Sequence, residues 1–181
     1  VGDIFFSFTD TAATVTDYRR ELDLSTGIAS VSFKRDGKKV EYEVFVPARE
    51  DLIVITMKSQ EEGGLDMDIM MTRPQDAEIT VSENRIDMEG QVVDPVDPER
   101  GPAGKHMKFY ASLIITNCDG ILTPGEHSLG YSGGKEITLF FNAHTDYNID
   151  YLNFDRTIDP RKECAEAISK ASSEGRSSVL C

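Results

Sequence analysis

An alternation of apolar and polar residues runs through most of this chain and constrains its fold more than any other feature. Apolar side chains take every second position in residues 42–46, 65–71, 109–115 and 137–141. Successive side chains of a β-strand point to opposite faces, so each segment predicts a strand with one buried and one wet face. Residues 52–55 are apolar throughout and predict a central strand covered on both faces.

Turn signals separate these segments at intervals of about ten residues. Asp36-Gly37 lies between two alternating segments, the usual pattern of a two-residue β-hairpin. Glycines at 63–64 and 120 mark the ends of later strands. The pattern indicates roughly nine strands, which favours an all-β, antiparallel β-sandwich with one C-terminal helix.

Two segments break the alternation. Residues 91–106 contain Pro95, Pro98, Pro102, Gly101 and Gly104 among charged residues, and predict a long loop.

Residues 159–174 predict the single helix. Asp159 suits the N-cap and Pro160 the first helical position, while Gly175 is placed to end the helix. An apolar stripe at helical spacing follows, made of Cys164, Ala167, Ile168 and Ala171. This stripe needs a covering surface, either this sandwich or a missing neighbour.

Composition excludes several classes of function. A net charge of -13 on 181 residues argues against a nucleic-acid partner, which needs a basic footprint. No run approaches the roughly 18 apolar residues of a membrane span. Cys118, Cys164 and Cys181 are odd in number and form no C-x-x-C pair, which argues against a disulfide framework or a cysteine zinc site.

The chain opens at Val1 without an initiator Met or a basic leader, so we expect a piece of a longer protein. The compartment stays unknown. A secreted or periplasmic parent stays open, because a leader would lie in the missing part.

Carboxylates on one strand form the first candidate for chemistry. Asp66 and Asp68, with Glu61 and Glu62 nearby, could flank a glycosidic bond as a pair of carboxylates must. Both aspartates alternate with apolar residues, however, and this is the pattern of a strand with one wet face. We favour that structural interpretation.

Histidines form the second candidate. His144 and Asp146 supply a base and a carboxylate at a strand end, but no nucleophile accompanies them, so strand-end hydrogen bonding is the favoured role. His106 and His127 lack ligand spacing, and residues 101–106 lack the spacing of a phosphate loop. We therefore assign no catalytic, cofactor-binding or metal-binding residue, and expect no cofactor.

Several segments resemble a known family. Tyr18-Arg19-Arg20-Glu21-Leu22-Asp23-Leu24, followed by residues 28–33, resembles the Y-x-R-x-L-D-L … A-x-V-x-Y strand pair of glycoside hydrolase family 95, the α-L-fucosidases. Residues 2–4, 42–47, 52–55, 109–113, 120–122 and 145–147 resemble further segments in that family's order. Two positions depart from the pattern, with Tyr42 in place of Arg and Ala48 where Ser is common.

The resemblance implies a supersandwich-like N-terminal domain over residues 1–158. It implies a linker helix and tail over 159–181, leading towards a missing catalytic (α/α)6 barrel. The parent would be an inverting α-L-fucosidase-type glycoside hydrolase acting on fucosylated glycans, with carboxyl groups roughly 6.5–9.5 Å apart in the barrel. No catalytic residue is carried onto this chain, which alone is expected to be inactive.

The partners implied are the catalytic barrel of the same polypeptide and, through the parent enzyme, the glycan. Two alternatives stay open: a free-standing carbohydrate-binding sandwich, and a structural or interaction domain. The sugar could also be an L-galactoside, because a fold does not fix a substrate.

Overall fold

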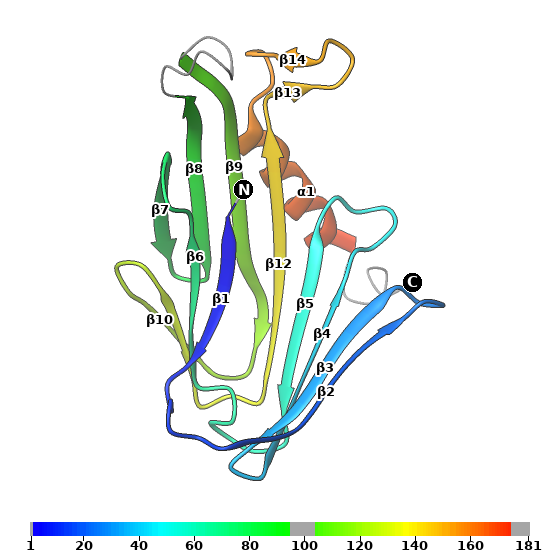
Figure 1. Ribbon diagram of the computed structural model, residues 1–181, viewed down its shortest axis with the longest axis vertical. Helices are drawn as coiled ribbons and strands as arrows, with labels where there is room; N and C mark the ends of the chain where they lie inside the picture. The colour runs from blue at the N-terminus through cyan, green and yellow to red at the C-terminus, as the bar shows by residue number, and fades with distance from the viewer. Residues whose placement is uncertain (1, 95–103, 175–181) are drawn as a thin grey trace.

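A computed structural model of this chain describes residues 2–94 and 104–174. Its strands form two main antiparallel sheets and a separate two-stranded hairpin, and a helix lies against the larger sheet (Figure 1). The predicted all-β sandwich with a C-terminal helix is therefore confirmed.

The small sheet has the spatial order β1 (Asp3–Phe8), β6 (Met67–Thr72), β11 (Leu129–Ser132) and β10 (Ile121–Pro124). The large sheet has the order β2 (Val15–Asp23), β3 (Ile28–Arg35), β4 (Lys38–Phe45), β5 (Ile53–Ser59), β12 (Glu136–Thr145), β9 (Gly104–Cys118), β8 (Arg85–Asp94) and β7 (Ala77–Ser82). A hairpin of β13 (Tyr147–Asn148) and β14 (Asn153–Phe154) precedes α1 (Pro160–Glu174). The sequence understated the number of strands because four of them have only two to four residues.

The main core lies between the two sheets and consists of the alternating residues. Met67, Ile69 and Met71 of β6 are buried there, while Asp68 and Met70 between them are only half-buried. The large sheet contributes Ile55, Met57, Phe109, Ala111, Leu113, Ile115, Ile137 and Leu139. At roughly 25 cal/mol per Å² of apolar surface removed from water, this interior is the main source of stability.

A second, smaller core lies on the other side of the large sheet, beneath α1. It joins Leu52, Val54 and Phe140 of the sheet region to Ala171 of the helix. Residues 52–55 are thus covered on both faces, as their composition predicts.

The helix begins where the sequence predicts. The Oδ1 atom of Asp159 accepts a hydrogen bond from the N–H of Arg161 at 3.0 Å, which satisfies one of the free amides of the first turn. Cys164 and Ala171 of the stripe are buried, so this sandwich itself covers the stripe. Gly175, the expected stop, lies outside the described residues.

The hairpin between β3 and β4 is also confirmed. Asp36 and Gly37 have φ values of 46° and 82°, the left-handed conformation that a type I′ turn requires at both positions. Gly37 takes it without steric cost, and the Asp36 carboxylate accepts the N–H of Thr14 at 2.8 Å.

The prediction of one loop over residues 91–106 is wrong at both ends. Residues 91–94 belong to β8 and residues 104–106 to β9, where Val93 pairs with Lys105 beyond a bulge. The bulge interrupts the regular pairing but lets the two strands continue to pair. The prolines and Gly101 of the expected loop lie outside the described residues.

A single carboxylate, just after β9, joins the end of that strand to β11 and to the start of β12. The Oδ1 atom of Asp119 accepts hydrogen bonds from the Tyr131 hydroxyl and from the N–H groups of Lys135 and Glu136, each at 2.9 Å. These donors, the Glu136 N–H above all, lower the pKa of Asp119. Burial and then the nearby Asp119 carboxylate raise the pKa of Tyr131.

We expect Leu139→Ala to lower the free energy of unfolding by about 2–5 kcal/mol, because the cavity it leaves lies between two packed sheets. Leu139 is fully buried. The exposed Ile121 supplies the control, since Ile121→Ala is expected to change stability by no more than about 0.5 kcal/mol. Urea denaturation of both variants measures the difference, and equal effects would contradict the assignment of the core.

We expect Asp119→Asn to destabilise the protein near neutral pH and to lose this effect in acid. A folded pKa below the unfolded value of about 3.9 gives stability that is present above the unfolded pKa. That stability disappears as the pH falls through the folded pKa. Urea denaturation over a pH series measures this, and a difference from the wild type that stays constant with pH would refute the role of the ionised carboxylate.

Candidate functional site

A groove of about 690 Å³ lies on the outer face of the large sheet, beside the start of α1. Strands β7, β8 and β9 line it together with residues 156–161, which lead into the helix. Its ionisable side chains include Glu78, Glu89, Lys108, Arg156 and Arg161. A second hollow of about 300 Å³ shares Glu78, Glu89, Tyr110 and Arg161 with it and extends along β7 and β8.

Two charged groups of this groove are paired with each other. Arg161 forms an ion pair with Glu89, which raises the pKa of Arg161, and its guanidinium lies 4.9 Å from the centroid of the Tyr110 ring. Burial, followed by the charge of Asp87, raises the pKa of Tyr110 to about 12. Tyr110 therefore stays protonated at neutral pH.

The negative charge of Asp87, in the adjoining hollow, is also compensated by neighbouring groups. Its carboxylate accepts the Ser112 hydroxyl at 2.7 Å and lies 3.0 Å from the Nε atom of Arg85. Paired ions of this kind suit the binding of polar groups, and their arrangement does not identify an acid and a base for proton transfer.

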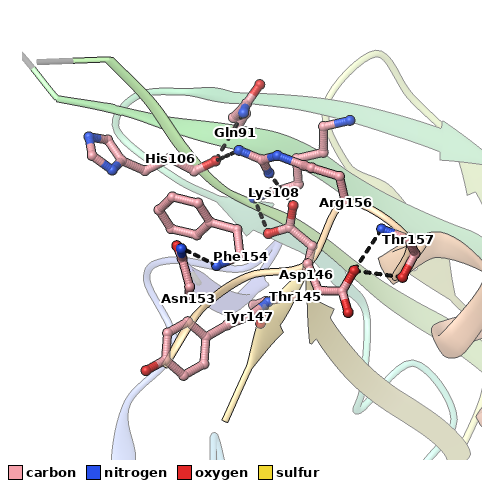
Figure 2. A network of polar contacts seen from close by, with 11 residues as sticks. Gln91, His106, Lys108, Thr145, Asp146, Tyr147, Asn153, Phe154, Arg156 and Thr157 are labelled. Atoms are coloured by element: carbon pink, nitrogen blue, oxygen red, sulfur yellow. Dashed lines mark hydrogen bonds and ion pairs between the residues drawn. The ribbon is translucent and has the colours of Figure 1, made fainter. Parts of the chain in front are cut away.

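A buried carboxylate joins the end of β12 to the segment that leads into α1 (Figure 2). Asp146 is fully buried, and its Oδ1 atom accepts the N–H of Lys108 at 2.8 Å. Its Oδ2 atom pairs with Arg156, which also donates to the carbonyl of His106 at 2.9 Å. The expected role of Asp146 in strand-end hydrogen bonding is confirmed, and the same carboxylate positions Arg156 at the groove.

Asp155 fixes the adjacent turn. Its Oδ1 atom accepts the hydroxyl of Thr157 at 2.6 Å and the N–H of the same residue at 3.0 Å. The Thr157 hydroxyl is the main reason that the pKa of Asp155 is lowered. Asn148 of β13 donates to the other oxygen at 3.3 Å, so the hairpin and the helix approach are tied together.

The acidic candidates of the sequence lie elsewhere, on the small sheet and the turn before it. Asp66 accepts the N–H of Gly133 at 2.8 Å, which joins two turns, and Asp68 is on the half-buried outer side of β6. Glu62 lies 3.8 Å from the Nζ atom of Lys135. These contacts support the structural interpretation of the alternating acids.

The three histidines are each near a different carboxylate. His144 lies 3.4 Å from Asp51, His106 lies 3.2 Å from Asp94, and His127 lies 3.6 Å from Glu126. Within residues 2–94 and 104–174, no group of three or more His, Cys, Asp and Glu side chains is arranged to hold a metal ion. Of the loop-like segment 101–106, the last three residues are in β9.

The sequence analysis missed the groove because its residues come from separate elements. Glu89 and Arg161 are 72 positions apart, and neither lies in a motif. The only sequence feature that could have pointed to the groove was the position of Arg161 in the first turn of a well-capped helix. In the described part of the chain, no helix has the length and apolar character needed to cross a membrane.

Comparisons with known proteins give three findings. A family model described as "Glycosyl hydrolase family 65, N-terminal domain" matches residues 1–150. "Alpha-L-fucosidase 2" of Arabidopsis thaliana is 24% identical over 187 residues, covering 93% of this chain and 22% of that protein. The solved structure "Putative kojibiose phosphorylase from human microbiome" has a TM-score of 0.56 at 11% identity, covering 98% of this chain and 26% of that one.

These findings differ in what they establish. At 11% identity the likeness to the phosphorylase structure concerns the fold alone. The chain spans only 22% of the length of the fucosidase, so the activity of that whole protein is not transferred by the match.

We expect Asp146→Asn to lower the free energy of unfolding by about 1.5–3 kcal/mol, because it removes the charged acceptor of buried hydrogen bonds. Asp150, exposed on the nearby hairpin, is the matched control, and Asp150→Asn is expected to cost no more than about 0.5 kcal/mol. Urea denaturation near neutral pH compares the two variants. Equal stability of both would refute the role of Asp146.

Proposed function

Because this chain belongs to the family of glycosyl hydrolase family 65 N-terminal domains, we propose that it is the non-catalytic N-terminal domain of an α-L-fucosidase-like glycoside hydrolase. The parent enzyme acts on fucosylated glycans. The domain braces the (α/α)6 catalytic barrel of the same polypeptide. The glycan is a partner only as the substrate of the whole parent enzyme.

The observation that carries this proposal is the match to the Arabidopsis fucosidase over 93% of the chain, in addition to the family match over residues 1–150. The sequence motifs of the family-95 strand pair support the same choice, since residues 19–23 of β2 pair with residues 28–32 of β3. The substrate assignment rests on these likenesses and not on a catalytic group in the described residues.

The structure suggests how such a domain would act. Helix α1 is fixed on the outer face of the large sheet by the small core around Phe140 and Ala171, and by the ion pair of Arg161 with Glu89. A barrel that follows the helix would therefore be held in a defined orientation. We propose the division into a sandwich of residues 1–158 and a linker of residues 159–181 on this basis.

A second candidate differs in the parent reaction. The family model carries the family 65 description, and the chain shares its fold with a structure described as a kojibiose phosphorylase. The parent would then transfer a glucosyl unit to inorganic phosphate, with the same supporting role for this domain. The family description names a glycosyl hydrolase and the likeness to the phosphorylase concerns the fold alone, whereas the fucosidase match favours the first candidate.

The test compares the full-length gene product with the 181-residue chain. We expect fucose release from a fucosylated oligosaccharide by the full-length protein and none by the 181-residue chain. Release by the short chain would overturn its non-catalytic role. Phosphate-dependent cleavage of kojibiose by the full-length protein, without fucose release, would replace the first candidate by the second. Activity in neither assay would overturn both substrate assignments.

A further inference from the structure

The hairpin of β13 and β14 ends in a cluster of exposed apolar side chains. Tyr147, Ile149, Tyr151 and Leu152 are 43%, 76%, 74% and 74% exposed, within six consecutive residues. We name these four residues the hairpin tip. Single exposed apolar residues are ordinary on protein surfaces, but a contiguous cluster marks an interaction site.

The base of the hairpin contacts β9 and the segment that leads into α1. Phe154 of β14 packs on the His106 ring, with centroids 5.6 Å apart, and the Arg156 guanidinium lies 5.0 Å from its centroid. Asn148 accepts the N–H of Asp150 at 2.9 Å and donates to Asp155. Figure 2 shows the Tyr147 ring on the side away from the Asp146 network. The apolar side chains are therefore displayed on an anchored turn.

The backbone of the tip supports the same interpretation. Leu152 has a φ of 51°, a left-handed conformation that is unfavourable for a bulky residue. Such conformations persist where surrounding contacts impose them, and they are concentrated at functional sites. The hydrogen bond from the Asn148 amide to Asp155 spans the turn that contains Leu152.

In the part of the chain that the structure describes, the other exposed large apolar residues do not form an equivalent site. Four lie singly, and the other four are spread along the edge strand β2 and the turn after it, where Tyr18 stacks on Phe33 at 6.5 Å. A second copy of this chain is disfavoured as the occupant, because a net charge of -13 opposes self-association. Two aliphatic side chains in the tip favour a protein surface over a sugar, which would stack on aromatic faces.

Size and connectivity indicate which protein surface covers the tip. The chain accounts for 22% of the fucosidase relative, and most of that protein lies outside the matched region. The hairpin immediately precedes α1 and lies at the end of the molecule where the helix begins (Figure 1). With 15 residues, α1 is about 22 Å long, which is shorter than the roughly 30 Å diameter of a small domain. A domain attached after the helix can therefore reach back to the tip.

We propose that the hairpin tip docks into an apolar groove on the catalytic domain of the same polypeptide and is the anchor of the interface between the two domains. The tip supplies the aromatic and aliphatic centre that such contacts need, and the paired charges of the neighbouring groove supply a polar rim. This inference rests on the proposed function, because it requires a catalytic domain in the parent protein.

The test is thiol labelling of Ile149→Cys, in the 181-residue chain and in the full-length protein. We expect labelling at least about tenfold slower in the full-length protein, because docking covers the tip. Ile121→Cys is the matched control, since Ile121 is 68% exposed on the small sheet, and we expect its two rates to agree. The unsubstituted proteins give the background from Cys118, Cys164 and Cys181, and the part from Cys164 is low because burial raises the pKa of its thiol to about 12.

Equal labelling of Ile149→Cys in both proteins would overturn the inference. It would leave the proposed function intact if the full-length protein released fucose. Protection that appeared only after addition of a fucosylated oligosaccharide would also overturn it, in favour of a glycan site. A second variant, Tyr151→Ser with Leu152→Asn, tests the energetics, since Asn tolerates the left-handed conformation. We expect it to lower the melting temperature of the full-length protein and to leave that of the 181-residue chain unchanged. The opposite pattern would refute docking.

Discussion

The burial of the central strands of the large sheet on both faces is the constraint on which the rest of the structure depends. Leu139 of β12 faces the small sheet, whereas its neighbour Phe140 faces α1. A sheet covered only on one side would leave Val54 and Phe140 in water. The helix is therefore part of the packing of this sandwich, and its position is determined by the same apolar surface that stabilises the strands.

This packing also determines where charged side chains can be placed in the interior. At the end of β12, backbone groups lose the partners that the sheet supplies and need others. Asp146 supplies acceptors there and is compensated by Arg156, as a buried carboxylate must be. The pair connects the end of the ladder to the approach to α1, so the groove, the hairpin and the helix share one set of fixed contacts.

Local patterns predicted much of the fold because their causes are local. Asp36-Gly37 formed its turn since both residues accept a positive φ, and Asp159 capped its helix since its carboxylate reaches the first free amides. The prediction of a loop over residues 91–106 was wrong at both ends because proline and glycine indicate a break in the strand pattern but not the length of that break. Pairing between β8 and β9, a property of two segments together, extends the strands into it. The alternation around Asp66 and Asp68 predicted a structural role for both residues, and their contacts in the fold support that role.

The sequence by itself determined the alternation, the turns, the capped helix and the family resemblance, because each depends on residues close together in the chain or on short motifs. Only the tertiary structure decided that Glu89 meets Arg161, that Asp146 meets Arg156 beneath the hairpin, and that four apolar residues remain uncovered at its tip. Those outcomes depend on strand register and on which surfaces cover one another. Neither is encoded in any single segment, because both arise from the simultaneous packing of elements far apart in the chain.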